Sequence, residues 1–176
     1  MKNMKKLLTA LALITLSSLT FAQKAGDKIE FKSTDFNGAP VTSELFSKNK
    51  LTMVNIWGTF CPPCIREMPD LARLNEANKS KGVEVIGIPI DVADRMGKVL
   101  PKTKADGEEI IKATGAAYTH VLPTMDMFST FLGRIQAVPA TIFVDQNGKM
   151  AGQMYLGAKT QKDWQKIIDE LLAKQK

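Results

Sequence analysis

The feature that most restricts the fold of this chain is a strand-like run that leads directly into a helical segment carrying both cysteines. Leu51–Trp57 is continuously apolar or β-branched, which is typical of a strand covered on both faces. After Cys64 the apolar residues recur at helical spacing, and Val83–Ile90 forms a second buried-strand pattern. A strand, a helix and a strand joined in this way predict a parallel pair with a right-handed crossover, and therefore an α/β fold.

The two cysteines, Cys61 and Cys64, are the only ones in the chain and stand two residues apart. Thiols at this spacing can close a small disulfide ring and reopen it when they take up two electrons. A helix beginning at Cys61 would favour a thiolate there, because its free N–H groups and its dipole attract negative charge. A disulfide across so short a loop constrains the unfolded chain very little, which argues against a purely structural bond. The pair therefore predicts thiol–disulfide exchange.

Composition excludes several other classes of function. The 176 residues suffice for one domain with a full core, and half of the formal charge of +6 comes from three lysines in the first six residues. Arginines and lysines do not cluster with aromatic residues, so binding of nucleic acid is not expected. Two cysteines and one histidine are too few for the usual structural zinc site. We expect neither a metal nor a cofactor.

Residues 1–22 have the pattern of an export signal. A basic start precedes an apolar stretch, and the small residues Thr20 and Ala22 occupy the positions that favour a cut after Ala22. The alternative is an uncleaved membrane anchor, although the uncharged run Leu7–Ala22 is shorter than the ~20 residues that span a bilayer comfortably. Both interpretations place the domain at 23–176 outside the cytoplasm, where disulfides persist. Contact with a membrane is expected only if the segment is not cleaved.

Patterns along the rest of the chain predict a mixed sheet with helices on both faces. Residues 91–105 are expected to be mainly loop, with 93–104 either a solvated loop or a specificity element, and His120 is expected at the surface or in a loop. The expected elements are a strand at 29–33, a short strand at 41–43, a helical turn at 43–46, a helix at 106–114, an extended piece at 120–122, a helical segment at 127–135, a strand at 140–144, a turn at 145–149, a returning strand at 150–156 and a last helix capped by Thr160.

This order of elements, with Cys-x-x-Cys at the first strand-to-helix junction, resembles the thioredoxin fold. The finer resemblance is to the exported TlpA/ResA-type proteins, which are relatives of the thioredoxins of cytochrome c maturation. It covers most of residues 29–172 and implies a thioredoxin-like central mixed sheet with an N-terminal β-hairpin extension. The matching stretches are dFNGapVtseLF, MVNIWGTFCPPCIREMP, VEVIGIPID, AVPATIFVDQNGKM and the closing helix.

The resemblance implies a role for each residue of the redox motif. Cys61 is expected to be the nucleophile, which attacks a partner's disulfide and forms a mixed disulfide. Cys64 is expected to resolve that intermediate by displacing the reduced partner. In thioredoxins a buried aspartate lies six residues before the first cysteine, and here that position is Asn55, which cannot take a proton. The TlpA/ResA-type motif often carries a glutamate three residues after the second cysteine, and Glu67 is therefore the expected proton acceptor.

The resemblance also implies where a substrate would bind. Pro139 matches the cis-proline of the family, and a cis X–Pro bond is uncommon enough to indicate a specific role. In this position it would leave the backbone of Val138 free to pair with an extended substrate strand. Trp57 and Phe60 are expected to shield the cysteine pair.

The expected function is that of an exported reductant, periplasmic or otherwise extracytoplasmic, which reduces disulfides in client proteins and receives electrons from a membrane-bound thiol donor. Apoproteins of cytochrome c are one candidate class of client. A disulfide-forming oxidase and a peroxiredoxin-like peroxidase are the alternative enzymes, and a module that carries haem or metal is a non-enzymatic one. The glutathione redox equilibrium, consumption of peroxide and trapping of partners at Cys61 after removal of Cys64 distinguish them.

Overall fold

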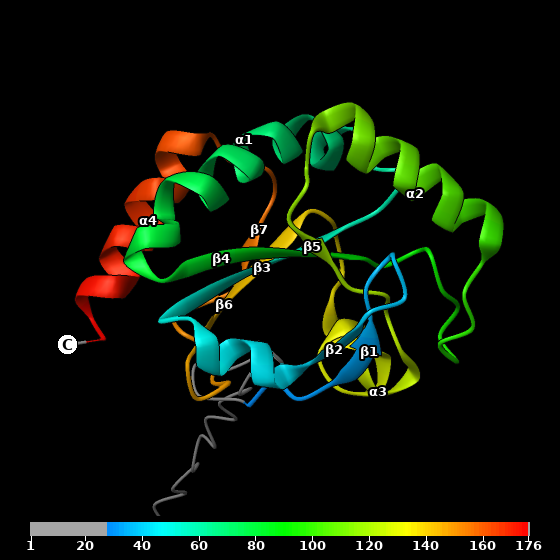
Figure 1. The fold of residues 1–176 in the computed structure, drawn as a ribbon, viewed down its shortest axis with the longest axis horizontal. Helices are drawn as coiled ribbons and strands as arrows, with labels where there is room; N and C mark the ends of the chain where they lie inside the picture. Colours follow the sequence, from blue (N-terminus) through cyan, green and yellow to red (C-terminus); the bar gives the residue numbers. More distant parts are fainter. Residues whose placement is uncertain (1–27, 176) are drawn as a thin grey trace, which may run out of the picture.

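The computed structural model of the chain describes residues 28–175, so the expected export segment at 1–22 lies outside the described residues. A five-stranded sheet with the order β5-β4-β3-β6-β7 forms the centre of the fold (Figure 1). The β3–β4 and β4–β5 pairs are parallel, whereas β3–β6 and β6–β7 are antiparallel, which confirms the predicted mixed sheet. Its strands are β3 Leu51–Trp57, β4 Val83–Pro89, β5 Thr119–His120, β6 Ala140–Asp145 and β7 Tyr155–Leu156.

Helices cover both faces of this sheet. Figure 1 shows α1, α2 and α4 on one side, with α3 and a 3₁₀ helix (η1, Ser43–Lys48) on the other. Two shorter 3₁₀ helices, η2 and η3, span Lys79–Lys81 and Leu132–Arg134. The α-helices are α1 Pro62–Asn78, α2 Pro101–Thr114, α3 Met125–Ser129 and α4 Gln161–Ala173. Among the described residues no helix is both long and apolar enough to cross a bilayer.

Strand β3 divides the core into two apolar clusters, because successive side chains of a strand point to opposite faces. Leu51, Met53 and Trp57 belong to the cluster beneath α1 and α4, together with both cysteines. Val54 and Ile56 belong to the cluster on the η1 and α3 side. Every residue of β3 is buried, including the polar Thr52 and Asn55, as expected of a strand covered on both faces.

The predicted N-terminal β-hairpin is present but is shifted along the chain. Strand β1, Lys32–Thr34, pairs antiparallel with β2, Pro40–Thr42. The Asp35 carboxylate accepts hydrogen bonds from the amides of the turn between them. The residues expected to form a strand at 29–33 instead place Ile29 and Phe31 in the core just before β1.

Three expectations for the second half of the chain are wrong. Helix α2 begins at Pro101 rather than 106, because proline is well suited to the first helical position. The returning strand at 150–156 is reduced to a bridge at Met150 and the two residues of β7. His120 is buried, with an exposed fraction of only 4%, because its ring on the edge strand β5 packs among aromatic rings.

Candidate redox site

The redox motif begins where β3 ends and α1 starts. Cys61 has extended backbone angles and is the N-cap of α1, with prolines at the first two helical positions. Proline suits these positions and has no N–H, so the amide of Cys64 is the first donor that the helix offers. That amide lies 3.3 Å from the Cys61 Sγ and donates to it. A thiolate of Cys61 would therefore be stabilised by this amide and by the helix dipole.

Cys61 and Cys64 form a disulfide, with an S–S distance of 2.08 Å and a Cα–Cα distance of 5.3 Å. Both cysteines are buried, but Cys61 is 5% exposed and Cys64 only 1%. A partner sulfur approaching from solvent therefore meets Cys61 first. This asymmetry matches the division into attacking and resolving cysteine that the resemblance implies.

The loop before β6 faces the disulfide. The Val138–Pro139 peptide bond is cis, as the resemblance implies, and the Val138 carbonyl oxygen lies 3.6 Å from the Cys61 Sγ. Trp57 is fully buried beside the cysteines, whereas Phe60 is 66% exposed. Trp57 therefore lies in the interior, and Phe60 presents an aromatic surface to solvent.

Glu67 is buried one helical turn after Cys64, on the same helix. Its Oε1 accepts hydrogen bonds from Trp164 Nε1 at 2.5 Å and from the Lys159 backbone amide at 3.0 Å. Its Oε2 is buried and has no hydrogen-bond partner among the described residues. Burial raises the pKa of Glu67 above its ordinary value, and the two N–H donors and the Lys159 charge oppose that rise.

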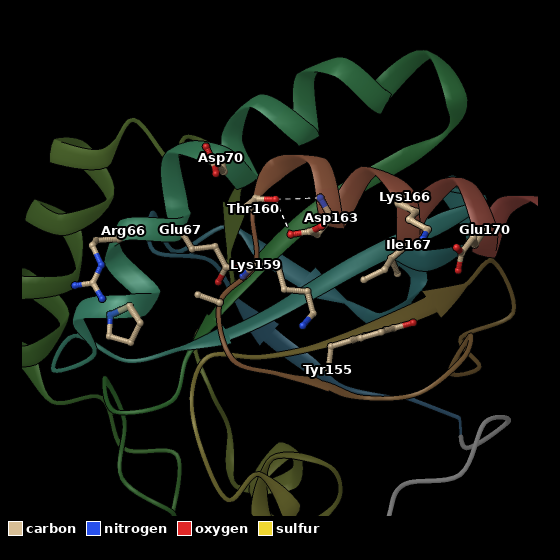
Figure 2. A pocket seen from close by; sticks show the side chains of 12 residues that line it. Arg66, Glu67, Asp70, Tyr155, Lys159, Thr160, Asp163, Lys166, Ile167 and Glu170 are labelled. Atoms are coloured by element: carbon tan, nitrogen blue, oxygen red, sulfur yellow. Dashed lines mark hydrogen bonds between the residues drawn. The ribbon is translucent and has the colours of Figure 1, made fainter.

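A groove of about 760 Å³ runs beside Glu67, between the start of α1 and α4 (Figure 2). Figure 2 shows Glu67 directed toward Lys159 at the base of α4. The Lys159 Nζ lies 5.5 Å from the Trp164 ring centroid and 6.0 Å from that of Tyr155, so its charge rests on the two aromatic faces. The groove gives solvent a route to the neighbourhood of the buried carboxyl group.

The strand position that carries an acid in thioredoxins is filled by Asn55 in a neutral network. Asn55 is buried, and its Nδ2 donates to Thr141 Oγ1 at 3.2 Å. Among residues 28–175, Glu67 is the only buried side chain with a carboxyl group. Within the described part of the chain, no three cysteine, histidine or acidic side chains gather as a metal site would require.

One contact at the site could not be predicted from the motif. The Asp91 carboxylate, just beyond β4, accepts hydrogen bonds from the Thr59 amide at 3.1 Å and from the Thr59 hydroxyl at 2.5 Å. These bonds join the turn before Cys61 to the end of the neighbouring strand. The only signal in the sequence is an acid directly after a buried strand, which is too common to identify its partner.

Comparisons with known proteins agree with this geometry. A family model described as Redoxin matches residues 24–168. The thiol-disulfide oxidoreductase ResA of Halalkalibacterium halodurans is 28% identical over 78% of this chain and 72% of its own length. ResA of Bacillus thuringiensis subsp. konkukian is 29% identical, over 80% of this chain and 74% of its own.

Solved structures show the same fold. A thioredoxin-family thiol:disulfide interchange protein from Chlorobium tepidum superimposes with a TM-score of 0.69 at 23% identity, covering 85% of this chain and 98% of that protein. StoA from Bacillus subtilis superimposes with a TM-score of 0.61 at 18% identity, covering 80% of this chain and 97% of that protein. The predicted thioredoxin-like fold is thereby confirmed.

Proposed function

This chain belongs to the Redoxin family, and from that premise we propose that it is an exported reductant of disulfides in client proteins. That it is a thioredoxin-like thiol–disulfide oxidoreductase of the TlpA/ResA type is shown by the family match and the ResA relatives. The proposal adds the direction of electron flow, the roles of the residues and the location.

The observation that carries the proposal is the position of Cys61 at the N-cap of α1. Its sulfur accepts a hydrogen bond from the first amide of the helix and lies 3.6 Å from the Val138 carbonyl oxygen, and Cys61 is the more exposed residue of the pair. A sulfur placed in this way can exist as a thiolate and can be reached by an extended chain that lies against Val138. Cys64 is less exposed, and its sulfur is bonded to that of Cys61.

The reaction consists of two exchanges. In the first, the Cys61 thiolate attacks one sulfur of the client disulfide, forms a mixed disulfide and releases the other client sulfur as a thiolate. In the second, the Cys64 thiolate attacks the Cys61 Sγ, closes the Cys61–Cys64 disulfide and releases the remaining client sulfur. The client gains two electrons and two protons, and the protein is oxidised. A membrane-bound dithiol donor would return both electrons by the reverse exchange.

Glu67 is the proposed proton acceptor for Cys64. The two residues are three positions apart on α1, which places them on the same side of the helix, and both are buried. The pKa of Glu67 is raised by burial, so its carboxylate is a better base than an ordinary glutamate. Solvent in the adjacent groove could then accept the proton.

The proposed binding site for the client surrounds Cys61. The backbone of Val138, held by the cis bond to Pro139, would pair with an extended client segment on one side of the disulfide. Phe60 would contact the client from the other side, because most of its ring is exposed. Trp57 would support the cysteine pair from below without touching the client.

A trapping experiment tests the roles of the cysteines. With Cys64→Ala the second exchange cannot occur, so we expect mixed disulfides at Cys61 that are visible on non-reducing gels and that identify the clients by mass spectrometry. Cys61→Ala is the matched control and should trap nothing. Equal trapping by the two variants would contradict the assignment of the nucleophile.

A second experiment tests the direction of electron flow. Equilibration of the protein with glutathione gives its reduction potential, which we expect to be much more negative than the about −120 mV of a strong dithiol oxidant. A value near that of the strong oxidants would favour a disulfide-forming oxidase. Fractionation of the expressing cells would test export.

A further inference from the structure

The single histidine of the chain lies inside a buried aromatic cluster next to the redox site. The His120 ring is stacked on Tyr118, with centroids 4.6 Å apart, and meets the Trp57 ring edge to face at 5.6 Å. Trp57 packs in the same cluster as Cys61 and Cys64. The proposed exchange steps do not use His120, so its burial requires another explanation.

A missing side chain makes this arrangement possible. His120 on β5 is directly paired with Gly87 on β4, and paired residues of neighbouring strands share a face. A Cβ on Gly87 would lie 2.4 Å from the His120 Nδ1 and 3.1 Å from the Trp57 Nε1. Both nitrogens therefore border the space that the glycine leaves open. The distance between them cannot exceed the sum of these two distances, and one bridging water can span that sum.

The hydrogen-bonding roles of the two nitrogens are complementary. The His120 Nε2 lies 3.0 Å from the Ala116 carbonyl oxygen, which can only accept, so we assign the ring hydrogen to Nε2. Burial lowers the pKa of His120 to about 4, and the neutral ring then has a lone pair on Nδ1. The indole Nε1–H can only donate. Both atoms are buried and have no hydrogen-bond partner among the described residues.

We propose that His120 is a positioning residue for Trp57, whose indole Nε1–H donates through one bridging water to the His120 Nδ1. The bond satisfies two buried polar atoms that would otherwise each destabilise the fold. It also fixes the indole, which belongs to the same apolar cluster as the cysteines. The consequence for exchange rests on the proposed function, whereas the bond itself does not.

Protonation would reverse the role of His120, because Nδ1 would become a donor facing another donor. A hollow of about 410 Å³ reaches the ring from the side of α2 and the β1–β2 turn. Around His120, Tyr118 stacks on the ring, and the Lys104 ammonium lies over Phe36, which itself meets the ring edge to face. The charged residues that line the hollow are Asp35, Glu108 and Lys112.

The indole N–H resonances of the two tryptophans test the proposal without any client. In the wild-type protein we expect the Trp57 N–H signal to shift with the His120 ring as the pH falls toward 4, while that of Trp164 does not follow the ring. In His120→Phe we expect the Trp57 N–H to exchange with solvent about tenfold faster, as loss of one hydrogen bond implies. His120→Gln, which retains an acceptor, should restore most of the protection.

Tyr118→Phe is the matched control, because it keeps the stacked ring and removes only a hydroxyl group that has no hydrogen-bond partner within residues 28–175. It should leave the Trp57 resonance and its exchange unchanged. The proposal would be overturned if the Trp57 N–H resonance did not shift as His120 titrates. It would also be overturned if the Trp57 N–H exchanged with solvent at the same rate in wild type and in His120→Phe. If trapping at Cys61 fails while the Trp57 signal follows His120, the proposed function is wrong and the positioning role stands.

Discussion

Glu67 and His120 are two buried titratable side chains near the same disulfide, and their surroundings prepare them for opposite tasks. Burial raises the pKa of Glu67 and lowers that of His120, so it favours the neutral form of both. Their partners differ. Glu67 receives two N–H donors, which favour an anion, whereas the ring N–H of His120 donates to a carbonyl oxygen. The raised pKa of Glu67 makes its carboxylate a stronger base than an ordinary glutamate, while His120 stays neutral above about pH 4.

The largest expected effect is on stability at acidic pH. In the unfolded chain His120 binds a proton below about pH 6.5, whereas in the folded protein it does so only below about pH 4. The free energy of unfolding should therefore fall by about 3 kcal/mol between pH 6.5 and 4, with no further loss from this group below 4. Urea unfolding of wild type and His120→Gln at several pH values measures it. If the unfolding free energy of His120→Gln depended on pH as steeply as that of wild type, His120 would not be the source of the effect, and its contrast with Glu67 would be lost.

A second prediction concerns Glu67→Gln, which leaves no group to accept the Cys64 proton. We expect closure of the mixed disulfide to slow by about a hundredfold at neutral pH, the lower end of general-base effects. Stopped-flow reduction of a model disulfide would measure it, with Glu76→Gln on the exposed side of α1 as the control. Unchanged cysteine pKa values and exchange rates would exclude the proposed role.

The same variant tests the opposite pH signature. Because the pKa of folded Glu67 lies above its unfolded value, the stabilising contribution of its neutral form is present at pH below about 4.5. It is lost as the pH rises through the folded pKa. The free energy of unfolding of Glu67→Gln should lack this decline. Relative to wild type, His120→Gln should therefore lose less stability as the pH falls, and Glu67→Gln should lose less stability as the pH rises.

A smaller effect is expected from Gly87→Ala. The added methyl group would meet the His120 ring at 2.4 Å, so we expect a loss of about 2 kcal/mol in unfolding free energy, as for other overpacked cores. Gly107→Ala in α2 is the control, because its methyl group would come no closer than 3.2 Å, to the edge of the Phe36 ring. Thermal and urea unfolding of both variants measure the difference. Equal stability of the two would show that the His120 ring can move aside.

The smallest effect is expected from Lys159→Met, which removes a positive charge near Glu67 but keeps the backbone amide that bonds it. The pKa of Glu67 should rise further, because that charge lowers it in the wild type. We expect a shift of the pH profile of exchange to higher pH and a change of only a few-fold in rate at neutral pH. Lys166→Met, in the same groove, is the control.

The parts of the fold that were predictable from the sequence depend on local patterns. The strand–helix–strand unit from Leu51 to Pro89, the cysteine at the helix start and the helix capped by Thr160 all follow from periodicity and capping residues. The position of Glu67 on the helix followed from the motif. Its burial did not, because it depends on Trp164, 97 residues away in the chain.

The histidine was misplaced for a similar reason. A two-residue strand has too little periodicity to identify, and the burial of His120 depends on a glycine in a neighbouring strand. The start of α2 at Pro101 was missed because its exposed lysines resemble those of a loop. In each case the deciding interaction connects segments that no local pattern links.

The hydrogen bonds from Thr59 to Asp91 have a consequence for the energy of the redox cycle. They anchor the turn before Cys61 to the end of β4 through atoms that the disulfide does not include. Opening the disulfide therefore frees two side chains but not the backbone that carries the nucleophile. A loose turn would lose conformational entropy when a client binds. In this turn that entropy has already been lost during folding. The reduced protein should thus meet its client in the shape that the oxidised protein shows.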